Sequence, residues 1–203
     1  WQVLFQGRTR GSKCISVREM ARLISGVSGR GFAPAKDSKA LLGTESQSLI
    51  FCENSRLTAG YGVARAVRED EQVSGDNFSF QMLDNGCCVM AVSDGMGSGY
   101  AACKESEMVI DLIEKFMEAG FLPDTALRMM NSAMVTHGEH NLFSTVDLMR
   151  LDLDSGEAAF YKIGAATTFI RHGKEVRMVT QKSMPVGVFV GQQVPKVTEQ
   201  LAD

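Results

Sequence analysis

The sequence predicts an α+β fold in which antiparallel strands form the core. Over residues 145–180, strand-like segments follow one another at intervals of about 8–12 residues, which is typical of an antiparallel meander. Upstream, strand-like segments at 77–83 and 87–93 are joined by an Asp-Asn-Gly sequence that favours a hairpin turn. Between these two regions, apolar residues recur every three or four positions, which predicts helices over 99–120 and from Pro123 onward.

Composition is that of a globular protein. The chain has 203 residues, of which 44% are hydrophobic and 22% charged, with a net charge of −3. This is enough for one domain with a core and an N-terminal appendage. Lys and Arg are dispersed, so we expect no nucleic-acid partner. No apolar run approaches the ~20 residues of a membrane helix, so we expect no membrane contact by this fragment. Five cysteines without metal-ligand spacing predict a reduced, cytoplasmic domain.

The N-terminal 45 residues divide into two segments. Residues 1–13 contain Val3-Leu-Phe-Gln-Gly7, which resembles a protease site used to remove tags, and the alternative is a native leading strand. Residues 14–45 carry an amphipathic helix from Ser16 to about Val27, with Ser16 and Glu19 as a capping box. We expect a loop and a short helix over 31–42.

Residues 46–203 then form the expected core. Segments 48–53 and 60–67 are typical of strands, and Arg65 occupies an alternating polar position in the second. In the helix over 99–120, Met108 and five other apolar residues predict one buried stripe. Glu105 and Glu107 fit a solvated acidic face better than a ligand role. The free N–H groups at the start of this helix favour a phosphate nearby.

Two histidines, His137 and His140, flank Glu139 in a polar segment downstream. The spacing mimics a metal site, but Gly138 and the absence of a helical pattern favour a mobile loop.

Two aspartates lie at the open end of the predicted hairpin. A three-residue turn pairs Leu83 with Cys87 and therefore Asp76 with Asp94, whereas a two-residue turn moves the partner of Asp76 to Gly95. Like charges opposite each other destabilise a sheet, so either one carboxyl stays protonated or a cation lies between them. Neighbouring glycines favour a hard cation such as Mg²⁺ or Mn²⁺. The alternative is that both aspartates only cap turns and helices.

Several motifs, in order and spacing, resemble the bacterial PP2C-type, metal-dependent serine/threonine phosphatases, and among them most closely the stage II sporulation protein E family. The similarity runs from about Cys14 to about Val188. The motifs are Gly62-Val-Ala-Arg65, Ser74-Gly-Asp-Asn-Phe78, Ser93-Asp-Gly-Met-Gly-Ser-Gly99, Ser144-Thr-Val-Asp-Leu148, Lys162-Ile-Gly-Ala-Ala166 and Met184-Pro-Val-Gly187.

This resemblance implies a PP2C-like α-β-β-α sandwich of two antiparallel sheets flanked by helices. It implies that Asp76, Asp94 and the Gly95 carbonyl bind metal, and that Arg65 contacts the substrate phosphate. The alternative for Arg65 is a strand arginine that faces solvent. The complete parent site would hold two Mn²⁺ or Mg²⁺ ions that activate a water, with no catalytic side chain as nucleophile. The substrate would be a phosphoserine anti-anti-sigma factor of sporulation, residues 14–45 a regulatory-type segment, and the parent protein membrane-anchored through a segment absent here.

The chain stops at Asp203, before the later aspartate motifs of the family. We therefore expect a core that lacks its C-terminal part and holds ligands for one metal position. An unpaired edge strand favours a homodimer. The competing hypothesis is a phosphatase-like binding module, or an inactive fragment, that recognises a phosphoprotein without turnover.

Overall fold

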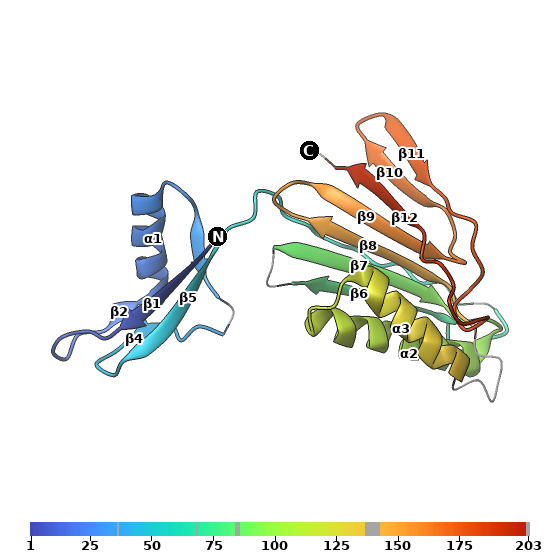
Figure 1. Cartoon of the computed structure of the whole chain (residues 1–203), viewed down its shortest axis with the longest axis horizontal. Helices are drawn as coiled ribbons and strands as arrows, with labels where there is room; N and C mark the ends of the chain where they lie inside the picture. The colour runs from blue at the N-terminus through green and yellow to red at the C-terminus, as the bar shows by residue number, and fades with distance from the viewer. Residues whose placement is uncertain (36, 68, 84–85, 137–142, 202–203) are drawn as a thin grey trace. The chain divides into compact units, whose positions relative to one another are not determined.

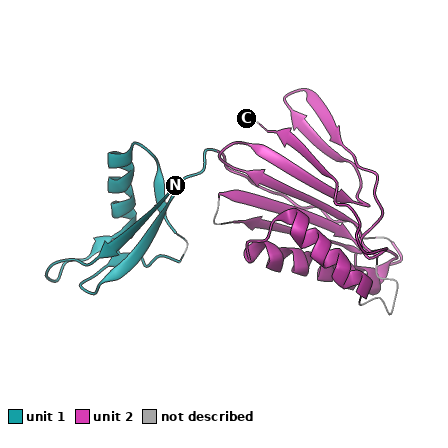
Figure 2. Cartoon of the chain, in the orientation of Figure 1, with its two compact units in different colours: residues 1–56 teal, residues 57–203 magenta. Residues whose placement is uncertain are grey.

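The computed structural model describes residues 1–35, 37–67, 69–83, 86–136 and 143–201. The chain divides into two compact units, residues 1–56 and 57–203, which Figure 2 distinguishes by colour. The sequence analysis placed the boundary at residues 45–46. The units divide later because β5 (Gln47–Glu53) pairs with β1 (Gln2–Gly7) and so belongs to the first unit.

The first unit is a small sheet covered by one helix. β5 lies between β1 and β3 (Phe32–Pro34) in an antiparallel sheet, and β2 (Ile15–Ser16) pairs with β4 (Leu41–Leu42). Helix α1 (Val17–Ser28) ends at Gly29, whose φ of 69° suits glycine. The helix and the sheet share a core of Val17, Met20, Ala21, Phe32, Leu42, Leu49 and Phe51.

Two local predictions for this unit are wrong. The helix forms as expected with Ser16 at its N-cap position, but the Ser16 side chain makes no cap hydrogen bond. The Ser16 backbone pairs with Leu41. The short helix expected over 31–42 is absent from the described part of that segment, since the pairing of β3 with β5 holds Phe32 in the core. Residues 2–7 form a strand, and the tag-remnant alternative stays a hypothesis.

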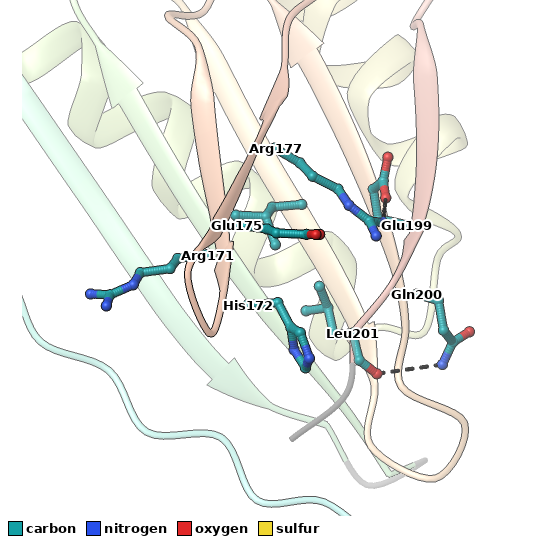
Figure 3. Close-up of a pocket in the computed structure, with 8 residues that line it drawn as sticks. Arg171, His172, Glu175, Arg177, Glu199, Gln200 and Leu201 are labelled. Carbon is teal, nitrogen blue, oxygen red and sulfur yellow. Dashed lines mark hydrogen bonds and ion pairs between the residues drawn. The ribbon is translucent and has the colours of Figure 1, made fainter.

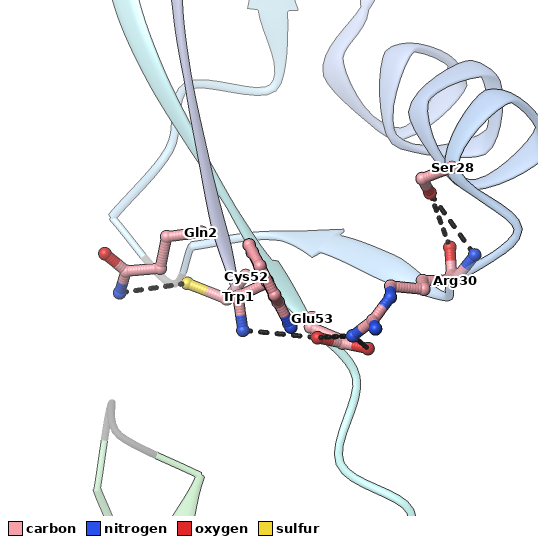
Figure 4. A network of polar contacts seen from close by, with 6 residues as sticks. All are labelled: Trp1, Gln2, Ser28, Arg30, Cys52 and Glu53. Carbon is pink, nitrogen blue, oxygen red and sulfur yellow. Dashed lines mark hydrogen bonds and ion pairs between the residues drawn. The ribbon is translucent and has the colours of Figure 1, made fainter.

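Polar contacts join the ends of this sheet to the turn after α1 (Figure 4). Arg30 donates to both carboxylate oxygens of Glu53, at 3.0 and 3.2 Å, and its guanidinium lies 5.1 Å from the ring centroid of Trp1. Partial desolvation raises the pKa of Glu53, but hydrogen bonds from the terminal amine and Arg30 outweigh it and hold that pKa below its usual range.

The second unit is built on a five-stranded antiparallel sheet in the order β12-β9-β8-β7-β6 (Figure 1). Its strands are β6 (Asp76–Met82), β7 (Cys87–Asp94), β8 (Val146–Asp152), β9 (Glu157–Ile163) and β12 (Lys196–Gln200). Helices α2 (Gly99–Glu118) and α3 (Pro123–Thr136) cover one face. The core between them includes Val89, Ala91, Val109, Ile113, Leu127, Met130, Leu148 and Tyr161.

The other face of this sheet packs against a two-stranded hairpin, β10 (Thr168–His172) with β11 (Glu175–Val179). Cys88 and Phe160, which alternate with the helix-facing residues, form a second core with Val179 of the hairpin. The predicted α+β class, with antiparallel sheets and helices outside, is therefore confirmed. A pocket of about 160 Å³ separates the hairpin from β12, beside the 3.3 Å Arg177–Glu199 ion pair (Figure 3).

Two other predictions for this unit are wrong. Residues 60–67 form no strand, because no neighbouring strand pairs with them in the described chain. That segment instead runs beside β6, where Tyr61 stacks on Phe80 with ring centroids 4.3 Å apart. In α2 the predicted buried stripe is wrong at Met108, which is exposed, whereas Val109, Ile113 and Met117 of the same stripe are buried as expected. Ala102, Ser106 and Ile110 are buried beside them.

No helix in the described part of the chain is long and apolar enough to cross a membrane.

A buried ion pair links three strands of the second unit. The Lys162 side chain of β9 is fully buried, and its ammonium donates to Asp147 of β8 at 2.5 Å and to Thr168 of β10 at 2.7 Å. Thr168 also donates to Asp147 at 2.6 Å. These contacts fix the hairpin on the sheet, because a buried ammonium without its carboxylate is strongly unfavourable.

We predict that Lys162→Met lowers the free energy of unfolding by about 3 kcal/mol, since it leaves Asp147 without its charge partner. Urea denaturation followed by circular dichroism measures the change. Lys174→Met, at an exposed position of the hairpin turn, is the matched control and should have little effect. An equal effect of both substitutions would contradict the assigned role of the ion pair.

Candidate metal centre

The hairpin β6–β7 brings two carboxylates to facing positions. Asp76 is the cross-strand partner of Asp94, and the Leu83 N–H donates to the Cys87 carbonyl at 2.8 Å. This is the register predicted from a three-residue turn. Residues 84 and 85 of that turn lie outside the described residues. The side chains therefore start from directly opposite backbone positions at the end of the sheet.

The electrostatics of the pair are unfavourable without a cation. Partial desolvation and the charge of Asp76 both raise the pKa of Asp94. Asp76 is held by Ser74, whose hydroxyl donates to Asp76 Oδ2 at 3.0 Å. Two hard oxygen ligands that repel each other favour either a proton or a cation between them.

Two glycines keep this end of the hairpin open and close to α2. A Cβ on Gly95 would lie 2.0 Å from the Ala102 carbonyl oxygen in the first turns of α2, so no side chain fits there. A Cβ on Gly75 would lie 3.5 Å from the Gly95 carbonyl oxygen and 3.7 Å from Asp94 Oδ1. These two oxygens thus lie beside the same space, next to the backbone that leads into Asp76.

The backbone at Asp94 is fixed by the segment that leads into β8. The Asp94 carbonyl accepts hydrogen bonds from Thr145 N–H at 2.9 Å and from the Ser144 hydroxyl at 2.8 Å. Asp94 N–H donates to Thr145 Oγ1 at 3.1 Å. The hydroxyls of Ser93 and Ser144, both fully buried, are 2.7 Å apart. These contacts limit how far Asp94 can move.

A second network ties Asp76 to α2. The Asn77 amide donates to the Ser106 hydroxyl and to the Cys103 carbonyl, each at 2.9 Å. The buried Ser106 hydroxyl donates to the Gly75 carbonyl at 2.5 Å. Helix α2 therefore holds the residues on both sides of Asp76, as it also packs on Gly95.

Arg65 lies beside the strand that carries Asp76. Its guanidinium donates to Asn77 Oδ1 at 3.1 Å and lies 5.9 Å from the ring centroid of Phe78. The side chain is exposed. The structure thus brings Arg65 to the residue next to Asp76, at the end of the sheet where the two aspartates lie.

Other candidates from the sequence lie elsewhere. Glu107 is exposed as expected, but the prediction of a solvated face is wrong for Glu105, whose Oε2 is buried without a hydrogen-bond partner in the described chain. Burial raises the pKa of Glu105. His137 and His140 lie outside the described residues. At the start of α2, a Cβ on Gly99 would lie 2.6 Å from Glu71 Oε2, so the Glu71 carboxylate lies close to this glycine.

Sequence reasoning assigned no role to the polar residues behind the site, which include Ser93, Ser144, Asn77 and Ser106. A serine in the otherwise apolar segment 87–93 was the available signal, because a buried hydroxyl needs a partner.

The donor set at this end of the sheet suits a hard divalent cation but is small. It consists of two carboxylates and the Gly95 carbonyl, all oxygen ligands of the kind that Mg²⁺ and Mn²⁺ prefer. In the described part of the chain, no three His, Cys, Asp or Glu side chains gather as a metal site. The two carboxylates and the carbonyl are oxygen ligands that fit a hard divalent cation.

We predict that Gly95→Ala destabilises the second unit by about 2 kcal/mol, because the new methyl group would overlap the Ala102 carbonyl and force α2 away. Thermal unfolding is the measurement. Gly60→Ala is the control, since nothing lies within 4 Å of the added Cβ there. Full tolerance of Gly95→Ala would mean that α2 does not approach as described.

We predict that Asp94→Asn stabilises the metal-free chain by about 0.5 kcal/mol at pH 7, a value discounted for solvent screening. The pKa of Asp94 is raised in the folded state above its usual value of 3.8. Protonated Asp94 therefore stabilises the fold below pH 3.8, and this stabilisation is lost as the pH rises through the folded-state pKa. Urea unfolding at pH 7 and about pH 3 tests this. The stability gained by Asp94→Asn should disappear at the lower pH. An equal gain in stability at both pH values would exclude charge repulsion as its cause.

Known proteins resemble this chain over most of its length. The family model described as Stage II sporulation protein E (SpoIIE) matches residues 84–203. Stage II sporulation protein E of Priestia megaterium is 34% identical over 140 residues, which are 69% of this chain and 24% of that protein. The Bacillus subtilis (strain 168) protein of the same name is 35% identical over 140 residues, again 69% of this chain and 17% of its own length.

One solved structure matches nearly the whole chain. It contains the PP2C phosphatase domain and a fragment of the regulatory domain of the cell fate determinant SpoIIE from Bacillus subtilis. It is 27% identical with a TM-score of 0.72, and the match covers 99% of this chain and 58% of that one. The chain matches about a fifth of the length of the two curated relatives. It belongs to the stage II sporulation protein E family and has the fold of PP2C-type phosphatases.

Proposed function

We propose that the chain is the metal-dependent protein serine/threonine phosphatase part of its parent protein. The observation that carries the proposal is the facing pair of Asp76 and Asp94 at the end of the central sheet. A like-charged pair at this position weakens the fold unless a proton or a cation lies between the two carboxylates. Membership of a PP2C-type phosphatase family supports the same activity.

In this proposal Asp76, Asp94 and the Gly95 carbonyl hold a Mn²⁺ or Mg²⁺ ion, and the complete parent site holds two. When bound, such ions neutralise phosphate charge and lower the pKa of a water, so that water can attack phosphorus without a covalent enzyme intermediate. The chain's own residues orient the site: Ser144 and Thr145 fix Asp94, and the network from Asn77 to Ser106 fixes the backbone beside Asp76.

Arg65 is the proposed phosphate contact. A planar guanidinium can donate two parallel hydrogen bonds to a phosphate. The Arg65 guanidinium contacts Asn77, the residue that follows Asp76 in β6. Its exposure leaves the guanidinium accessible to a substrate.

The proposed substrate is a phosphoserine anti-anti-sigma factor of sporulation. This follows from the resemblance to the sporulation phosphatase, and the relatives' names support a sporulation role. We also propose that residues 14–45 belong to a regulatory segment, since the Bacillus subtilis structure that matches 99% of this chain contains a fragment of a regulatory domain. A cytoplasmic location, membrane anchoring of the parent and a homodimer belong to the same proposal.

A binding module without turnover is the second candidate. The small donor set favours it, because no three His, Cys, Asp or Glu side chains gather as a metal site in the part of the chain that the structure describes.

Phosphate release from a phosphoserine protein, with and without Mn²⁺, tests the proposal. The 203-residue chain and a C-terminally extended version are each compared with their Asp94→Asn variants. We expect the extended chain to need Mn²⁺ and to lose at least a hundredfold in kcat on substitution, because Asp94 contacts the metal that neutralises phosphate charge. Activity that persists in Asp94→Asn would contradict the assigned site. Binding of the phosphoprotein without release would favour the binding module.

A further inference from the structure

Large apolar side chains are exposed at the end of the sheet that carries Asp76 and Asp94. They come from the turn after β7, the first turn of α2 and the loop that follows β11, and their exposed fractions range from 40% to 76%. We call them the apolar rim: Met96, Tyr100, Met184, Val188, Phe189 and Val190.

The loop that carries most of the rim is held rigidly. Asn131 of α3, itself buried, accepts a hydrogen bond from Gly187 N–H and donates to the Phe189 carbonyl, each at 2.9 Å. At the start of the loop, Ser183 donates to the Lys162 carbonyl at 3.0 Å, and Gln192 donates to the Met184 carbonyl. A loop pinned at both ends, with its apolar side chains directed to solvent, is typical of a binding surface.

The rim adjoins the candidate metal centre through the backbone. Gly95 bridges Ser144, and Ser144 bridges Val186, so three segments lie side by side. Neighbouring strands are about 4.8 Å apart, which places Val186 about 10 Å from Gly95. The Met96 N–H also donates to the Phe143 carbonyl at 2.9 Å.

From this geometry we propose that the apolar rim is the surface on which the polypeptide of the phosphoprotein substrate docks. A standard protein interface buries about 800 Å² on each partner, which corresponds to a disc about 16 Å in radius. A phosphoserine that reaches the Asp76–Asp94 pair brings the rest of its protein over the rim. The inference rests on the proposed function, and it adds where the substrate protein is recognised.

The chemistry of the rim specifies the kind of partner. Aromatic and methionine side chains are enriched in the centres of protein interfaces. The substrate is therefore expected to present an apolar surface next to its phosphoserine.

The test compares a protein substrate with a small one. The double variant Phe189→Ser/Val190→Ser is assayed in the C-terminally extended protein with Mn²⁺, on a phosphorylated anti-anti-sigma factor and on p-nitrophenyl phosphate. We expect kcat/KM for the phosphoprotein to fall at least tenfold, mainly through KM, with the small substrate changed less than twofold. Tyr100→Ser, on a different element of the rim, should act in the same direction.

The control is Phe169→Ser/Met178→Ser, which removes two apolar side chains, 65% and 70% exposed, from the hairpin β10–β11. It should leave both substrates unaffected. Equal losses on both substrates, or none on the phosphoprotein, would overturn the docking proposal. If the rim variant changes only the monomer–dimer equilibrium, the rim is instead a contact between copies.

Failure of the proposed function is separable from failure of the docking surface. If the unsubstituted protein releases phosphate from neither substrate, the proposed activity fails, and the rim is then tested by binding of the phosphoprotein measured by titration calorimetry. Weaker binding by the rim variant than by the hairpin control would uphold docking, and equal binding or none would overturn it.

Discussion

Two carboxylates that repel each other, held at facing positions by the register of one hairpin, are the constraint on which the rest of the second unit depends. Asp76 and Asp94 cannot separate, because seven consecutive residue pairs join their strands. Partial desolvation raises the pKa of Asp94, and the charge of Asp76 raises it further. A one-residue slip would move one carboxylate to the opposite face of the sheet, so the register and the site are maintained together.

Three neighbouring parts of the chain contact the residues around the two aspartates. Helix α2 approaches so closely at Ala102 that residue 95 must be glycine, and through Ser106 it also holds Gly75. Ser144 and Thr145, which lead into β8, hold the backbone of Asp94. The loop at Val186 extends this arrangement outward to the apolar rim. A displacement of α2 would therefore reach both aspartates.

The sequence predicted what depends on local pattern. Alternation and turn residues were sufficient for the β6–β7 hairpin and narrowed its register to two alternatives, of which the structure shows Asp76 opposite Asp94; Pro123 marked the start of α3. What it could not predict depends on tertiary pairing. The segment 60–67 has a strand-like pattern but no partner strand, and Phe32 enters a strand because β5 lies beside it. The burial of Glu105 and the contacts of Ser144 arise between elements far apart in sequence, so no local pattern indicates them.

The central claim is that the space between Asp76 and Asp94 holds a divalent cation. Crystals of the chain grown with Mn²⁺, with diffraction recorded at the manganese absorption edge, test this most directly. The account predicts an anomalous peak within about 2.5 Å of a carboxylate oxygen of Asp76 or Asp94, and none in an Asp76→Asn/Asp94→Asn variant. Full occupancy at another position, with no peak at this pair, would contradict it.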